Sequence, residues 1–274
     1  MSIRPLHAFL ALACLVAPAH ADGRLEAKYK ITLAGITVGA GTWTLDVSEE
    51  GYSGSASGKV AGVLRLFASG EGSATARGQI AAGKVVPTSF TLNSTRGSKT
   101  DHVRIAMAAN VVRDFSAEPP PSPGGDRVPL TPEHKKGVVD PGSAAILPVS
   151  GAGDLLRPDA CNRTVPVFDG RQRYDLVMSY DRMETAKDVK GYSGQLVICH
   201  IAYRPVAGHR SGREDLITLA DNHTIEAWFG PVAGSRVLVP VRVSLVTSFG
   251  TLVVQATQFS AEPTKRQALQ PETR

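Results

Sequence analysis

The chain has 274 residues, of which 42% are hydrophobic and 20% are charged, and its 30 Lys and Arg residues face 25 Asp and Glu residues. This composition is sufficient for a sizeable core and excludes a disordered protein, a collagen-like fibre and a small disulfide-stabilised scaffold. The net charge of +5 is too mild for a nucleic-acid-binding surface, and beyond residue 20 no apolar run approaches the roughly 18 residues of a membrane-spanning helix.

The N-terminus resembles a secretory signal peptide. Arg4 supplies the positive charge, residues 8–16 form the apolar segment, and residues 19–21 read Ala-His-Ala, which is the pattern of a signal-peptidase site. We therefore expect cleavage between Ala21 and Asp22 and export of the mature chain.

Lipidation of Cys14 is the alternative for this segment. Leu12, Ala13 and Cys14 resemble the end of a bacterial lipobox, but Ala11 stands where a lipobox has leucine. The apolar segment before Cys14 would also be very short, so we favour cleavage after Ala21.

In the first half, apolar and polar residues alternate with a period of two between short turn signals. Trp43, Leu45 and Val47, for example, form an apolar row between hydroxyl-bearing and acidic residues. One-sided alternation predicts an antiparallel sheet with one solvated face. The strands predicted here span residues 28–33, 42–48, 52–60, 72–78, 85–95, 102–108 and 111–115.

A proline-rich loop is predicted over residues 117–136, where three consecutive prolines prevent a packed core. After the loop, Asp140 followed by Pro141 is the pattern of an N-cap and first helical residue. We expect a short helix that continues to Leu147 and is ended by Pro148.

The second half returns to strand patterns. Asp169 and Gly170 predict a type I′ hairpin turn, and Pro205, Pro231 and Pro240 are expected at strand ends or edges. The predicted strands span residues 165–168, 171–180, 195–204, 215–219, 224–229, 237–246 and 251–260. The proline-rich loop could separate two domains, but we favour a single β domain over residues 22–262, followed by a disordered tail over residues 263–274.

Two cysteines, Cys161 and Cys199, remain after removal of the leader. In an exported chain such a pair most simply forms a disulfide. The alternative is a metal site that adds His200 and His209 to the cysteines. Because Cys199 and His200 are neighbours on a predicted strand, their side chains point to opposite faces and cannot both bind one ion without a bulge. We predict the disulfide and no metal site.

The sequence carries no recognisable catalytic motif. The nucleophile elbow G-x-S-x-G, the zinc motif H-E-x-x-H and the phosphate-binding glycine loops do not occur. Asp221 and His223 fit a turn, and the charges from Asp169 to Asp175 fit a solvated hairpin face. We predict no catalytic residue, no cofactor and no nucleic-acid partner, and we name no ligand-binding residue.

Four segments together resemble a known family. They are Tyr29-x-Ile31-x-Leu33-x-Gly35-Ile36-x-Val38-Gly39, Asp140-Pro141 with Ser143, Val167-Phe168-Asp169-Gly170-Arg171 leading into Tyr174, and Cys199-x-Ile201-x-Tyr203-x-Pro205-Val206-x-Gly208. In this order, over residues 24–262, they resemble the exported proteobacterial proteins grouped as domain of unknown function 3108. The resemblance implies a periplasmic, β-rich protein with no assigned reaction. The layout is also similar to that of EipB, an envelope-integrity protein with a spiral β-sheet and one disulfide. More distantly, it is similar to LolA and LolB, lipoprotein carriers whose curved sheet holds acyl chains.

We therefore expect a mainly β protein, built as one large, strongly curved antiparallel sheet or open barrel with one short helix. The favoured function is that of a non-enzymatic periplasmic envelope protein that binds a lipid, acyl chain or peptide in the curved sheet, with an envelope lipid or lipoprotein as partner and no transmembrane segment in the mature chain. The alternative is a structural or interaction module for envelope integrity without a small ligand. A hydrolase is the third and least supported function.

Overall fold

The computed structural model describes residues 22–62, 69–121, 126–211 and 224–264, and within them fourteen strands form one antiparallel sheet. The order is β7-β6-β5-β4-β3-β2-β1-β14-β13-β12-β11-β10-β9, with β8 paired to β13. The strands are β1 (Asp22–Leu33), β2 (Ile36–Ser48), β3 (Gly51–Val60), β4 (Gly70–Ala81), β5 (Lys84–Arg96), β6 (Lys99–Ala108), β7 (Val111–Glu118), β8 (Leu147–Pro148), β9 (Arg163–Phe168), β10 (Arg173–Thr185), β11 (Gln195–Ala207), β12 (Glu226–Val232), β13 (Val237–Thr247) and β14 (Gly250–Thr264).

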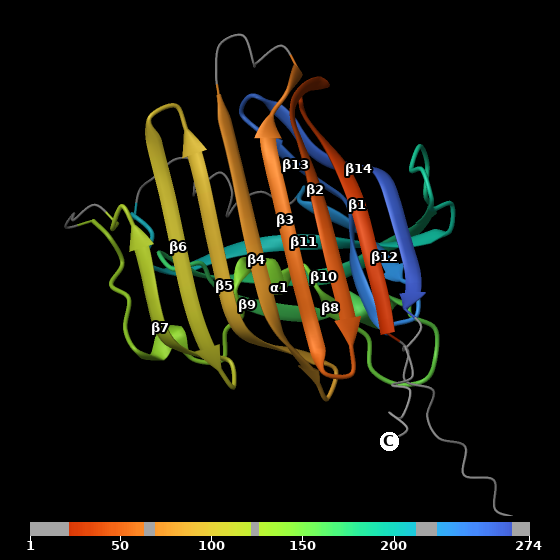
Figure 1. Ribbon diagram of the computed structural model, residues 1–274, viewed down its shortest axis with the longest axis horizontal. Coiled ribbons are helices and arrows are strands. Elements are labelled where there is room, and N and C mark those ends of the chain that lie inside the picture. The colour runs from red at the N-terminus through yellow and green to blue at the C-terminus, as the bar shows by residue number, and fades with distance from the viewer. Residues whose placement is uncertain (1–21, 63–68, 122–125, 212–223, 265–274) are drawn as a thin grey trace, which may run out of the picture.

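The sheet is strongly curved and open. Figure 1 shows β1 to β7 as a tilted front layer, with β9, β10 and β11 crossing behind it at a steep angle. The short helix α1 (Pro141–Ala144) lies inside the curve, where it packs against β4, β5 and β9. The predicted fold class, a mainly β protein with one large curved antiparallel sheet, is confirmed.

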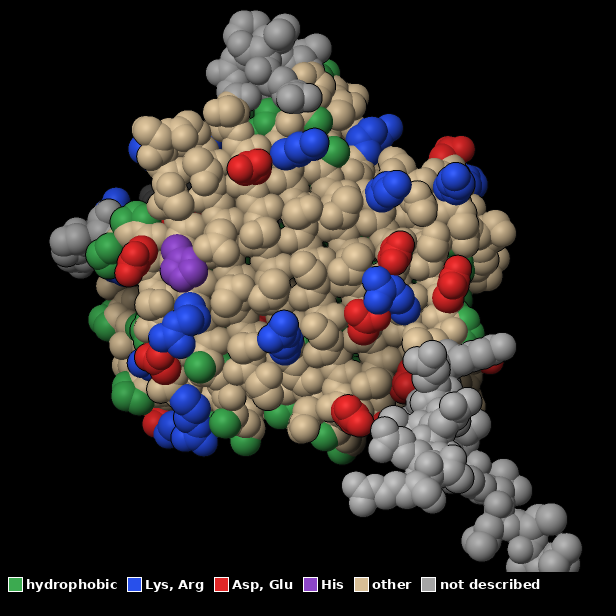
Figure 2. Space-filling model, viewed as in Figure 1, with side chains coloured by type: hydrophobic (Ala, Val, Ile, Leu, Met, Phe, Trp, Pro, Cys, Tyr) green, Lys and Arg blue, Asp and Glu red, His purple; other side chains and the backbone are tan. Residues whose placement is uncertain are grey.

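Period-two alternation explains the two faces of the front layer. Along β3, Tyr52, Gly54 and Ala56 point inward, and Ser53 and Ser55 are exposed. Figure 2 views the outer face, which consists largely of backbone and uncharged polar side chains, with charged side chains mostly toward its margins. This is the solvated face that one-sided alternation predicts.

Two apolar clusters stabilise the fold from inside. The larger cluster combines residues of the front layer with residues of β9 and of β11 to β14; its fully buried side chains include Leu25, Leu45, Ile105 and Phe168. The second cluster packs residues 147–161 against β11, β12 and β13. Both faces of β11 are therefore covered, because Val197 belongs to one cluster and Ile198 to the other.

The helix after the proline-rich loop is shorter than predicted. Its start is as expected, because the Asp140 side chain accepts a hydrogen bond from the Ser143 backbone N–H at 2.9 Å and Pro141 is the first helical residue. The helix ends at Ala144 rather than Leu147. The prediction was wrong at this end because Leu147 and Pro148 pair with β13, and that strand contact overrides the local helical preference.

The hairpin between β9 and β10 is not the predicted two-residue type I′ turn. Arg173 pairs with Phe168, so four residues form the loop. Gly170 has a φ of +90°, but Asp169 does not share the left-handed conformation that a type I′ turn requires. The Asp169 carboxylate instead accepts hydrogen bonds from the backbone N–H groups of Arg171, at 2.8 Å, and Gln172, at 2.6 Å.

The expectation that the prolines lie at strand ends holds for Pro231, the penultimate residue of β12, and for Pro205, two residues before the end of β11. It was wrong for Pro240, which lies inside β13. Pro240 is tolerated because β13 itself has a bulge next to it, where Val241 has no partner on β12, and because the pairing of β13 with β14 begins only at Arg242. Proline has no backbone N–H, and at this position its absence does not interrupt a continuous ladder of hydrogen bonds between strands.

Several predictions fall on or near residues that the structure does not describe. The signal peptide (1–21) and the strand predicted at residues 215–219 lie outside the described residues. In the proline-rich loop, β7 continues to Glu118 and Glu133–Lys135 form a 3₁₀ helix. At the C-terminus β14 reaches Thr264, and the rest of the predicted tail is outside the described residues. None of the described helices has the length and hydrophobicity that crossing a membrane requires.

Candidate functional site

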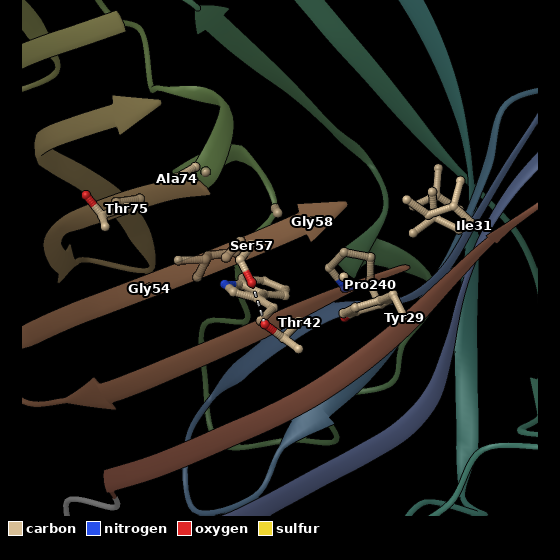
Figure 3. Close-up of a pocket in the computed structure, with 18 of the residues that line it drawn as sticks. Tyr29, Ile31, Thr42, Gly54, Ser57, Gly58, Ala74, Thr75 and Pro240 are labelled. Carbon is tan, nitrogen blue, oxygen red and sulfur yellow. Dashed lines mark hydrogen bonds between the residues drawn. The ribbon is translucent and has the colours of Figure 1, made fainter. Parts of the chain in front are cut away.

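An apolar hollow of about 310 Å³ lies on the concave side of the sheet. One wall consists of the inner faces of β2, β3 and β4, and the opposite wall comes from β1, β13 and β14. Figure 3 shows Tyr29 and Pro240 together on one side, with Ala74 across the hollow. The floor is formed by Gly142, Ala145 and Ile146, in or next to α1.

The hollow exists because small residues occupy the inward positions of adjacent strands. Gly41 on β2 pairs with Gly58 on β3, and Ala56 on β3 pairs with Ala74 on β4. None of these residues carries a side chain larger than a methyl group, so a void remains where neighbouring rows are filled. Further down the same strands, large inward side chains such as Leu45 occupy the space completely.

A buried polar network holds the floor in place. Asp140 and Ser143 are both 0% exposed. The Ser143 hydroxyl donates to the Asp140 carboxylate at 2.5 Å, so the Tyr52 hydroxyl is the donor in its 2.6 Å contact with Ser143. Burial raises the pKa of Asp140, and the hydrogen bonds from Ser143 partly offset this effect. The network attaches α1 to β3 and so fixes the residues that line the floor.

A second buried contact closes the wall. The Tyr29 hydroxyl on β1 donates to the Pro240 carbonyl oxygen on β13 at 2.8 Å. Burial raises the pKa of Tyr29 further above its ordinary value of 10, so the hydroxyl is a donor across the physiological pH range. This bond connects β1 directly to β13, although β14 lies between them in the sheet.

Few polar side chains reach the hollow. The Thr42 and Ser57 hydroxyls contact each other at 2.9 Å, as the dashed line in Figure 3 shows, but both side chains are on the exposed outer face of the sheet. Arg242 also belongs to the lining, but its guanidinium group stacks on Trp228 at 4.9 Å and donates to Gln255 at 3.3 Å. The lining therefore offers dispersion and hydrophobic contact more than hydrogen bonding.

Cys161 and Cys199 form the predicted disulfide, with both residues 0% exposed. The bond lies in the second apolar cluster and is not part of the hollow. Because both sulfurs are used in the bridge, they cannot serve as thiolate ligands, and the alternative Cys-His metal site is not formed.

His200 on β11 lies in a group of charged side chains from β10, β11 and β12. Its Nε2 is 3.5 Å from Asp181, and Glu226 is close to its Nδ1. These three residues could in principle hold a cation. However, Arg182 already pairs with both carboxylates and with Glu184, and its positive charge offsets the negative charge that would attract a metal ion.

Two other histidines are not part of the hollow. His134 is in a 3₁₀ helix, where its Nδ1 accepts from the Thr131 backbone N–H at 3.1 Å. His223 lies outside the described residues. Sequence reasoning missed the lining residues themselves, although the small inward residues of β2, β3 and β4 were a visible signal.

Comparison with known proteins identifies the family. The model described as "Protein of unknown function (DUF3108)" matches residues 28–257, and no curated protein matches the chain. Among solved structures, the chain is similar to a beta-barrel-like protein of DUF1849 from Brucella abortus, with 11% identity, a TM-score of 0.49 and coverage of 89% of this chain and 98% of that chain. A DUF1329 family protein from Desulfovibrio piger has 11% identity, a TM-score of 0.21 and coverage of 92% and 89%. The chain belongs to the DUF3108 family of proteins of unknown function.

Proposed function

We propose that this protein is an exported protein of the cell envelope that holds the acyl chain of a lipid in the hollow. The observation that carries the proposal is the hollow itself, whose volume is about 310 Å³ and whose walls are mainly apolar. A dry apolar cavity of about 150 Å³ is already large enough to bind benzene. The hollow is therefore a suitable space for a segment of alkyl chain.

An acyl chain suits this lining better than a peptide does. A peptide brings backbone N–H and C=O groups, which must find hydrogen-bond partners when they leave water. The Thr42 and Ser57 hydroxyls are on the exposed outer face, and the wall residues that point inward are mostly apolar or glycine. An alkyl chain needs no such partners and gains about 0.8 kcal/mol for each methylene group that it buries.

Location in the periplasm is part of the proposal. The Cys161–Cys199 disulfide is typical of an oxidising compartment. The pattern of a cleavable leader before Asp22 supports the same location.

A structural or interaction module remains the second candidate, and one observation favours it. The outer face has a shallow trough that runs across β2 to β5 and is lined by Thr42, Ser57, Ser73 and Asn93. Such a polar surface could bind a partner without any ligand in the hollow. In that case the acyl-binding experiments below would be negative.

Trp43 provides a test, because it lines the hollow. The purified, delipidated mature chain is titrated with stearic acid brominated at mid-chain, since bromine quenches indole fluorescence at contact distance. We expect saturable quenching in the wild type. A Trp43→Phe variant, which keeps Trp228 as a second indole, should bind unlabelled stearate but show little quenching by the brominated chain. Equal quenching in both proteins, or no saturable quenching in either, contradicts the proposal.

A further inference from the structure

The exposed large hydrophobic side chains gather at one end of the sheet. Among the described residues they are Ile36, 55% exposed, Val246, 47% exposed, and Phe249, 81% exposed. Ile36 follows the β1–β2 turn, and the other two lie at the β13–β14 turn. The turns adjoin, because the Ala34 backbone N–H donates to the Thr251 carbonyl oxygen at 3.0 Å. Both lie at the upper end of the sheet in Figure 1. We call Ile36, Val246 and Phe249 the apolar tip.

The wall of the hollow continues to the apolar tip without a polar residue. Ile31, Val254 and Val243 pair across three strands and line the hollow. Two residues further along each strand, the next row on the same face is Leu33, Leu252 and Leu245. This second row reaches the two turns that carry the apolar tip. The hollow and the tip are thus joined by one apolar surface.

The turns that carry the tip are suited to a medium without water. Residues 33–36 and 245–252 include no Asp, Glu, Lys or Arg. Within the β13–β14 turn, the Thr247 hydroxyl donates to the Gly250 carbonyl oxygen at 2.7 Å and accepts from the Phe249 backbone N–H at 3.2 Å. Polar backbone groups that are paired within the protein can enter a lipid interface at low cost.

We propose that the apolar tip docks onto a lipid bilayer, inserting Phe249 and Ile36 among the acyl chains. This brings the apolar surface that leads into the hollow against the membrane. Docking would allow an acyl chain to pass between the membrane and the hollow, and this role rests on the proposed function. Docking itself does not require an occupied hollow. A second copy of this chain is a poorer occupant, because a stable protein interface buries about 1,200–2,000 Å², and side chains on two narrow turns provide much less.

The test uses the mature chain and phosphatidylcholine vesicles in a flotation assay. We expect the wild type to float with the vesicles. Substitution of both tip residues, Phe249→Ser with Ile36→Ser, should lower the partition coefficient at least about tenfold, since each removes most of a buried apolar side chain. The matched control is Glu50→Ser, in the exposed β2–β3 turn at the opposite end of the sheet. Because the tip carries no charge, binding should persist at roughly 0.5 M NaCl, a concentration that screens surface charges.

A Phe249→Trp variant locates the contact directly. Its added indole should shift its emission to the blue and be quenched by brominated phosphatidylcholine, beyond the response of the wild type. The proposal is overturned if the serine variant floats like the wild type, or if the tryptophan stays in water when vesicles are present. A dimer in solution that depends on Phe249, without flotation, would assign the tip to self-association instead. Stearate binding by the serine variant without vesicles reports separately on the hollow, so the two proposals can fail independently.

Discussion

Replacing both Cys161 and Cys199 by alanine should destabilise the protein strongly. The disulfide joins residues separated by 38 positions. Closing a loop of this length removes conformational entropy from the unfolded chain that corresponds to about 4 kcal/mol in the chain-entropy model. The loop includes β9, β10 and the start of β11, so the bond restricts a large part of the second half of the sheet.

The assay is urea unfolding of the mature chain at equilibrium, followed by far-UV circular dichroism. The oxidised wild type is compared with the double alanine variant and with wild type reduced by a thiol. The reduced wild type keeps both sulfur atoms in the second apolar cluster and therefore serves as the control for lost packing. We expect both to lose about 4 kcal/mol. If the oxidised and reduced chains unfold within about 1 kcal/mol of each other, the reasoning about loop entropy is wrong for this protein.

Three further predictions concern the walls of the hollow. Burial raises the pKa of Asp140 above its ordinary value of 3.8, so folding favours the protonated acid. The free energy of unfolding should therefore fall as the pH rises from near 3.8 through the raised pKa. Asp140→Asn should flatten this pH dependence, which urea titrations at several pH values would measure. Tyr29→Phe removes the hydrogen bond to Pro240 and should cost about 1 kcal/mol in the same assay; an unchanged midpoint would mean that the bond does not form. Gly142→Ala places a methyl group 2.7 Å from the Ala76 Cβ and should cost about 1–3 kcal/mol, whereas the control Gly153→Ala, with Arg157 3.7 Å away as the nearest group, should be nearly neutral.

The strands were predictable because one-sided alternation is a local signal. The row of Trp43, Leu45 and Val47 placed one face of β2 inward before any pairing was known, and β2 includes these residues. Cys161 and Cys199 were likewise predictable as a pair from the leader and the cysteine count.

Elements that depend on distant contacts could not be predicted. The helix that starts at Pro141 ends early because β13 pairs with Leu147. That partner, Leu238, is far along the chain, so no local sequence pattern around Leu147 reveals it. Pro240 sits within β13 next to a bulge at Val241 in the same strand, which the sequence does not reveal.

The hollow depends on register in the same way. Gly58 and Ala56 are visible in the sequence as small residues in a strand pattern. Only the alignment of β2, β3 and β4 shows that these residues pair with Gly41 and Ala74. This pairing is what creates one void instead of scattered gaps.

Native mass spectrometry of the protein purified from its own envelope tests the central claim most directly. Wild type should carry the added mass of one lipid. Ala56→Leu should fill part of the hollow and lose the adduct, whereas Ser55→Leu, next to it but on the exposed face of β3, should keep it. Bare protein in all three samples, or an adduct that the Ala56→Leu variant retains in full, would contradict the assignment of the hollow as an acyl-chain site.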